Sequence, residues 1–320
     1  MNKFTIFLTA FITNIYAFYI GVGGITACYE NNITSYYKNC KNPLPLYKTF
    51  SSAKNINAFS VWITRDWKEQ WYPSDMINDF IKHGYTPIFI FYYFADDISP
   101  KYVKTHTKEY FKHLKKFREY LNKINGKKIV IINPEYNENG MHNSKDFDIL
   151  QTESIMQLKD ENTSVGICLG DFGNYNKIWD SENWDLYENS MKFSSKVSDF
   201  IAFQEMRALT RNTKQEILNT PLRALAFATY LHKKYNKPTF LAYLAVSSYK
   251  DEKLQSDVFK EFAKIMPLFK HSANLKGFNL FNYIDVPTHK GYFKEAEKYF
   301  GIIKADGEKK PAFKNFLNIK

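Results

Sequence analysis

The chain contains few cysteines and no familiar spacing of metal ligands. Its 320 residues include three cysteines, Cys28, Cys40 and Cys168, and no two of them form a CxxC motif. The seven histidines include no HExxH pattern. Zinc sites depend on such spacings of sulfur and nitrogen ligands. We therefore predict no metal site and no cofactor.

Glycine is also sparse. There are 13 glycines, and no GxGxxG or Walker-type loop follows an apolar stretch. Both motifs hold nucleotide phosphates on backbone N–H groups, so their absence argues against a nucleotide-binding doubly wound sheet. The sequence contains no internal repeat and no low-complexity linker, which favours a single folded domain.

The charge balance is basic, because 44 lysines and arginines face 33 aspartates and glutamates, for a net charge of +11. Basic proteins attract polyanions. The lysines are nevertheless dispersed: Lys112, Lys115, Lys116 and Lys123 fall on one predicted helix whose other face is apolar. No arginine-rich block or nucleic-acid motif occurs. We expect a solvated basic surface and no specific nucleic-acid binding.

The N-terminus predicts export. A short basic start precedes an apolar run from Phe4 to Ala17, and Ile15-Tyr16-Ala17 resembles a cleavage site, so residues 1–17 are predicted to be a signal peptide of a secreted or periplasmic protein. Alternatively, Ile25-Thr26-Ala27-Cys28 resembles a lipobox, which would lipidate Cys28 and attach the protein to a membrane.

The predicted state of Cys28 and Cys40 depends on which of these two processing routes occurs. After cleavage at Ala17, Cys28 and Cys40 remain close in sequence and can form a disulfide in an oxidising compartment. Cys168 lies in an apolar stretch and is predicted to be a buried free thiol.

Along the chain, short apolar stretches alternate with segments whose apolar residues have the spacing of a helix. Seven stretches read as buried strands, namely residues 58–64, 87–94, 129–132, 164–169, 199–203, 239–246 and 277–283. Helices are predicted between them and at the end, including residues 74–81, 149–158, 185–197, 251–269, 311–317 and a helix that starts at Thr220-Pro221 and runs to Tyr235. Such strands form a parallel sheet covered on both faces. With residues 18–23 as an eighth strand, residues 18–320 form one (β/α)8 TIM barrel, the alternative being a doubly wound sheet.

Polar residues recur at the carboxyl ends of these stretches, which share one face of a parallel barrel. Glu135 and Glu205 each follow an apolar strand. A pair of carboxylates can protonate a leaving oxygen and supply a nucleophile or base, so these two are the candidate catalytic residues. The candidate substrate-binding residues are Asn137, Asp66, Trp62, Asp171, Gln204, Arg207, Tyr243, Ser247 and Asp285.

Aromatic residues make up 18% of the chain, and rings of this kind can stack on sugars. Further rings near the strand ends that can contribute are Trp67, Trp71, Tyr92, Tyr93 and Tyr175.

Three motifs resemble those of clan A (β/α)8 glycoside hydrolases, with mannanase-like family 26 the nearest pattern. Glu135-Tyr136-Asn137 is similar to the Glu-Met-Asn that carries the acid/base in family 26. The segments 278–283, 299–302 and 310–313 resemble the closing strand, "FGI" and "KPAF" of such barrels. The resemblance implies hydrolysis of a polysaccharide or oligosaccharide, with Glu135 as acid/base.

The chain departs from that pattern at the seventh strand, where clan A enzymes carry a nucleophilic glutamate. Residues 239–249 offer Ser247, Ser248 and Tyr249 instead, and Glu205 belongs to the sixth strand. The alternative hypotheses are therefore a non-catalytic glycan-binding barrel and a lipid-anchored envelope protein of structural role.

Overall fold

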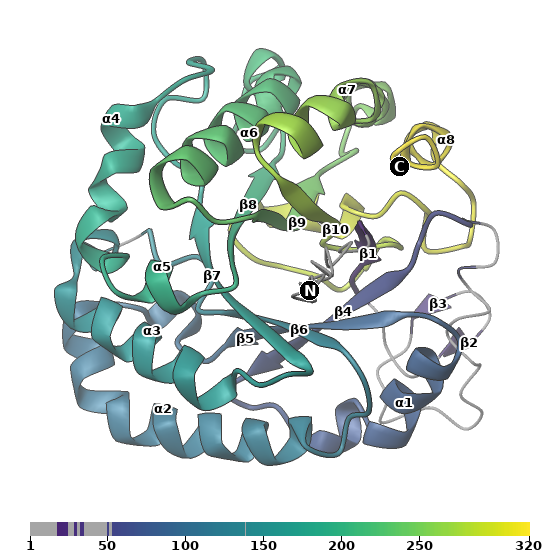
Figure 1. The fold of residues 1–320 in the computed structure, drawn as a ribbon. Helices are drawn as coiled ribbons and strands as arrows, with labels where there is room; N and C mark the ends of the chain where they lie inside the picture. Colours follow the sequence, from purple (N-terminus) through teal and green to yellow (C-terminus); the bar gives the residue numbers. More distant parts are fainter. Residues whose placement is uncertain (1–17, 25–28, 31–32, 35–49, 51–52, 138) are drawn as a thin grey trace, which may run out of the picture.

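The computed structural model describes residues 18–24, 29–30, 33–34, 50, 53–137 and 139–320. Eight parallel strands close a barrel in chain order, with β1 pairing both β10 and β4 (Figure 1). The strands are β1 Tyr19–Val22, β4 Ala58–Thr64, β5 Thr86–Tyr92, β6 Lys128–Ile132, β7 Thr163–Gly170, β8 Phe200–Arg207, β9 Thr239–Val246 and β10 Leu275–Leu280. The predicted (β/α)8 barrel and its eighth strand are confirmed. The predicted signal peptide and the Cys28–Cys40 disulfide lie outside the described residues.

Helices surround the barrel (Figure 1). They are α1 Ser74–Lys82, α2 Pro100–Leu121, α3 Lys145–Leu158, α4 Ser181–Trp184, α5 Ser194–Val197, α6 Lys214–Tyr235, α7 Glu252–Ser272 and α8 Pro311–Phe316. Short 3₁₀ helices are η3 Glu69–Trp71, η4 Ala95–Asp97, η5 Met141–Asn143, η6 Asp185–Ser190 and η7 Lys294–Tyr299, and a small antiparallel pair joins β2 Tyr29–Glu30 to β3 Ile33–Thr34. In the described part of the chain, no helix is both long and apolar enough to cross a membrane.

The predicted start of α6 at Thr220-Pro221 is wrong. The helix begins at Lys214, where Thr213 and Glu216 form a reciprocal capping box. Pro221 lies inside the helix, where a proline forgoes one backbone hydrogen bond. The capping box satisfies the N-terminal N–H groups of the helix from Thr213, seven residues before Thr220. It therefore fixes the first residue of α6.

The predicted single helix over residues 185–197 is also wrong, because the chain forms η6 and α5 with a break between them. The N–H groups of Phe193 and Ser194 donate to the carboxylate of Asp148 on α3, each at 2.8 Å. These two N–H groups therefore bind the Asp148 side chain and not the carbonyl oxygens of the preceding helical turn, so one continuous helix does not form.

Alternate residues of the strands face the barrel interior, as the pleat requires. Ile88, Ile90, Ile129, Ile131 and Cys168 pack together inside, all at most 5% exposed. Cys168 is a buried free thiol, as predicted. Since apolar side chains fill the barrel below its carboxyl ends, a ligand has space at the mouth and not within the barrel.

Candidate active site

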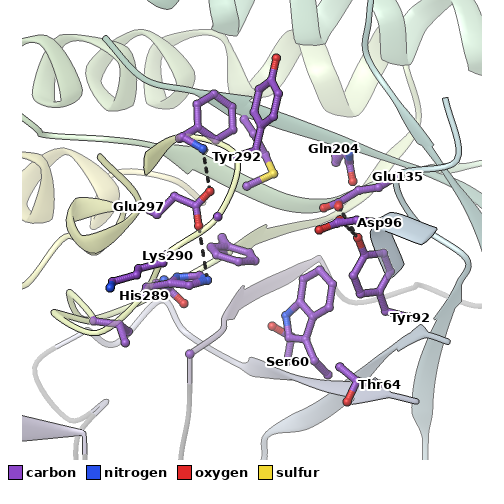
Figure 2. Close-up of a pocket in the computed structure, with 18 of the residues that line it drawn as sticks. Ser60, Thr64, Tyr92, Asp96, Glu135, Gln204, His289, Lys290, Tyr292 and Glu297 are labelled. Atoms are coloured by element: carbon purple, nitrogen blue, oxygen red, sulfur yellow. Dashed lines mark hydrogen bonds and ion pairs between the residues drawn. The ribbon is translucent and has the colours of Figure 1, made fainter. Parts of the chain in front are cut away.

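A cavity of about 830 Å³ opens at the carboxyl ends of the strands (Figure 2). Its walls come from the ends of β4 to β8 and from residues 281–297 after β10. The acidic residues that line it are Asp96, Glu135, Asp171 and Glu297, and the basic ones are Arg207, Lys290 and His289. The cavity is therefore not positively charged, although the chain as a whole is basic.

Glu135 reaches this cavity through an unusual backbone turn. The chain leaves β6 after Ile132, and both Asn133 and Glu135 adopt left-handed conformations, with φ of 48° and 63°, on either side of Pro134. Such a conformation costs a non-glycine residue of order 1 kcal/mol or more and is held by its surroundings. Here Asn133 N donates to Phe91 O at 2.9 Å. The turn aims the Glu135 side chain into the mouth of the barrel.

Two tyrosine hydroxyls hold the Glu135 carboxylate. Tyr243 on β9 donates to Oε1 at 2.6 Å, and Tyr92 on β5 donates to Oε2 at 2.8 Å. The Tyr92 hydroxyl also contacts Asp96 Oδ1 at 2.9 Å. Burial, followed by the nearby Glu135 charge, raises the pKa of both phenols above the ordinary value. Both hydroxyls therefore keep their protons and act as donors.

Trp62 provides an aromatic wall beside this carboxylate. Its ring centroid lies 5.3 Å from that of Tyr92, 5.2 Å from Tyr243 and 5.6 Å from Phe281. Trp62 also lines the cavity. The indole thus gives the cavity an apolar face next to a carboxylate.

Glu205 lies inside β8 rather than beyond its end. Gln204 and Met206 line the cavity, whereas Glu205 between them is fully buried and absent from the lining. Its Oε2 lies 2.8 Å from Arg207 Nη2. Burial raises the pKa of Glu205 well above the ordinary value, and the charge of Asp171 adds to this, against the opposing effect of Arg207. The pairing of Glu205 with Glu135 stays a prediction that requires Glu205 to leave this position.

Asp171 and Arg207 line the cavity but belong to a buried ionic cluster. Arg223 donates to Asp171 from Nε at 2.5 Å and from Nη2 at 2.8 Å, and Arg207 donates from Nη2 at 3.0 Å. Trp184 Nε1 donates to the same carboxylate at 2.9 Å. The Arg207 guanidinium also lies 3.7 Å from the centre of the Tyr175 ring. These groups bind one another and form the base of one wall.

The structure brings some of the other predicted residues to the cavity. Asn137 and Gln204 line it. Tyr243 is fully buried behind the lining and reaches Gln204 Oε1 through its hydroxyl. Of the additional aromatic residues, Tyr92 and Tyr175 line the cavity, whereas Trp67 and Tyr93 are buried in the core and Trp71 lies in η3 away from the lining.

Three predicted binding residues lie elsewhere. Asp66 is exposed and outside the lining. Ser247 is buried and donates to Ala296 O at 2.6 Å. Asp285 pairs with Lys310 Nζ at 2.6 Å and accepts from Gly301 N at 2.9 Å. Burial raises the pKa of Asp285 to about 6, against the lowering effect of Lys310. Asp285 thus joins the closing segments of the chain to the barrel.

The wall formed after β10 is not predicted by the sequence. His289, Lys290, Tyr292 and Glu297 line the cavity there (Figure 2). Glu297 accepts from Phe293 N at 2.8 Å and lies 3.6 Å from His289 Nε2. This segment has no apolar periodicity and no motif, so its sequence carried no signal. Among the residues that the structure describes, no group of three or more His, Cys, Asp or Glu residues could hold a metal ion.

No protein-family model and no curated protein sequence matches the chain. Solved structures do match. A GH5_18 enzyme from Bifidobacterium longum is 13% identical with a TM-score of 0.64, and the match covers 94% of this chain and 78% of that one. A family 26 β-mannanase from Bacteroides ovatus is 10% identical with a TM-score of 0.61, covering 95% of this chain and 88% of that one.

A family 39 glycoside hydrolase from Bacteroides cellulosilyticus is 11% identical with a TM-score of 0.56; the match covers 94% of this chain and 63% of that one. One variant of the Bifidobacterium enzyme is in complex with the disaccharide Manβ1-4GlcNAc. The resemblance to clan A glycoside hydrolases, including family 26, is confirmed at the level of the fold.

Proposed function

We propose that the protein is a secreted glycoside hydrolase that cleaves a polysaccharide or oligosaccharide, with Glu135 as the acid/base. The observation that carries this proposal is the position of Glu135. It projects from the end of the fourth barrel strand into the cavity, where two tyrosine hydroxyls hold its carboxylate. Glu135 would protonate the leaving glycosidic oxygen and then accept a proton from the incoming water.

The lining favours a neutral glycan. Carboxylates outnumber basic groups in the cavity, so a polyanionic chain would meet repulsion there. Trp62 offers an apolar edge, while Asn137 and Gln204 supply amide groups for sugar hydroxyls. The structural neighbours that act on or bind mannose-containing β-linked sugars are consistent with this class.

The activity test uses β-1,4-mannan, β-1,4-glucan and xylan together with the 2,4-dinitrophenyl β-glycosides of mannose, glucose and xylose. Release of reducing ends or of dinitrophenol by the purified protein is the expected result. A specific observation favours one alternative: the seventh barrel strand, β9, and the residues just after it carry no glutamate, although clan A enzymes have one there. If a glycan array gives binding while no substrate of the panel is turned over, the protein is a glycan-binding barrel.

The hydroxyl of Tyr243 is expected to contribute to turnover. Tyr243→Phe removes the 2.6 Å hydrogen bond to Glu135 Oε1. Hydrogen bonds to charged groups contribute about 1.5–3 kcal/mol, so kcat should fall by roughly 10- to 150-fold while KM changes little. Steady-state kinetics on the best substrate of the panel provides the measurement. Tyr230→Phe, which removes a bond to Asp185 on the outer layer, is the matched control and should keep its kcat; equal rates for both variants would contradict the role.

Secretion is proposed from the N-terminal pattern. We expect residues 1–17 to be removed on export, so that intact-mass spectrometry of the mature protein finds Phe18 as the first residue. An acylated Cys28 at the N-terminus would instead support the lipoprotein alternative. Retention of Met1 in the exported fraction would contradict both forms of processing.

A further inference from the structure

We propose that Asp96 is the second reacting carboxylate and attacks the anomeric carbon as the nucleophile opposite Glu135. This inference rests on the proposed function and names the second carboxylate of the reaction. It assigns catalysis to a residue at the end of the third barrel strand, a position that neither the family resemblance nor the seventh strand supplies.

The geometry places Asp96 beside Glu135. Asp96 Oδ1 and Glu135 Oε2 lie 2.9 and 2.8 Å from the same Tyr92 hydroxyl oxygen, so the two carboxylate oxygens are less than about 6 Å apart (Figure 2). In retaining glycosidases the two carboxyl groups are about 5–5.5 Å apart, whereas inverting enzymes separate them by about 6.5–9.5 Å. The shared tyrosine therefore holds these two carboxylate oxygens closer together than the carboxyl separation of inverting enzymes.

The strand register explains this proximity. β5 and β6 pair in parallel with Phe91 opposite Ile132, so their carboxyl ends lie side by side. Asp96 follows β5 in the 3₁₀ helix η4, which starts at Ala95 with a left-handed φ of 49°. The neighbouring Asp97 is absent from the cavity lining and pairs with Arg65 at 3.2 Å. The turn thus separates two adjacent aspartates, one facing the cavity and one on the outer surface.

The other carboxylates near the cavity form ion pairs or hydrogen bonds with groups other than Tyr92. Asp171 binds two arginines. Glu297 accepts a backbone N–H and lies near His289 on the wall formed after β10 (Figure 2). Glu205 is fully buried against Arg207. Among the lining carboxylates of the described residues, Asp96 is the one that shares a hydrogen-bonding partner with Glu135.

The reaction needs water as its single co-reactant. In the first step, an Asp96 oxygen forms a bond to the anomeric carbon, the glycosidic C–O bond breaks, and the proton of Glu135 moves to the leaving oxygen. In the second step, Glu135 takes a proton from water, the water oxygen bonds to the anomeric carbon, and the Asp96 carboxylate leaves. The Tyr92 hydroxyl can donate to either carboxylate as its charge changes.

The test compares Asp96→Ala with Asp97→Ala and Glu135→Gln on the 2,4-dinitrophenyl glycoside that the wild type cleaves fastest, with and without sodium azide. Asp96→Ala should lose at least about 10³-fold in kcat. Azide should restore turnover and give a glycosyl azide of inverted anomeric configuration, as determined by NMR. Asp97→Ala should retain the wild-type rate.

Three results would overturn the inference. Wild-type activity in Asp96→Ala, together with a Glu135→Gln variant that no longer releases reducing ends from the glycan, would remove Asp96 and leave the proposed function intact. An inactive but folded Asp96→Ala variant that azide does not rescue, or that yields an azide of retained configuration, would exclude the nucleophile role. Failure of the wild type to cleave any substrate of the panel would overturn the proposed function and this inference with it.

Discussion

Glu135→Gln is expected to lower kcat on a natural glycan by about 10²–10⁴-fold, the range that a positioned general acid contributes. Glutamine keeps the shape of the side chain and an oxygen that can accept from Tyr92 or Tyr243, but it has no proton to give to the leaving oxygen. The melting temperature should change little, because Glu135 is half-buried at the mouth of the barrel and not part of its core. Reducing-end release and thermal denaturation on the same preparation measure both quantities.

The substrate provides an internal control for this variant. A dinitrophenyl leaving group departs without protonation, so the loss of rate in Glu135→Gln should be smaller on the dinitrophenyl glycoside than on the glycan. Glu153→Gln on the exposed face of α3 is the matched substitution and should leave both rates unchanged. An equal loss on both substrates would contradict acid catalysis, and unchanged activity would remove Glu135 from the mechanism.

Arg223→Ala is expected to destabilise the fold by about 3–5 kcal/mol, because it leaves a buried carboxylate without its principal cation. Arg223 is 1% exposed and donates twice to Asp171. It also donates to the carbonyl oxygens of Asn174 and Lys177, each at 2.7 Å. The substitution therefore removes both an ion pair and the anchor of the loop after β7. Urea-induced unfolding, followed by circular dichroism, measures the free energy of unfolding.

Arg65→Ala is the matched control for this prediction. Arg65 and Asp97 form an ion pair whose side chains are 43% and 56% exposed, and exposed pairs contribute about 0–1 kcal/mol. The free energy of unfolding should therefore fall by less than about 1 kcal/mol in Arg65→Ala. Equal losses in the two variants would show that the buried cluster does not carry the stability assigned to it.

The C-terminal end of β8 was not predicted correctly from the local pattern of apolar residues. The apolar run ends at Phe203, which predicted that Gln204 and Glu205 lie beyond the strand, yet β8 continues to Arg207 by pairing with β9 as far as Val246. Polar residues can occupy a buried strand when their charges are paired. Here Arg207 on the same strand pairs with Glu205 and also with Asp171, which follows β7. A single sequence does not reveal such pairs.

The sequence by itself determined the barrel and the place of Glu135. Unalternating apolar strands separated by helices leave few ways to bury both faces of a sheet, and Glu135 follows directly after the apolar run that ends at Ile132. Tertiary structure alone decided its surroundings: Tyr92 and Tyr243 meet it from strands 43 and 108 residues away, and residues 281–297 close the far wall. The physical reason is that burial pattern is a local property of the chain, whereas hydrogen-bonding partners depend on which strand ends the closed barrel brings together.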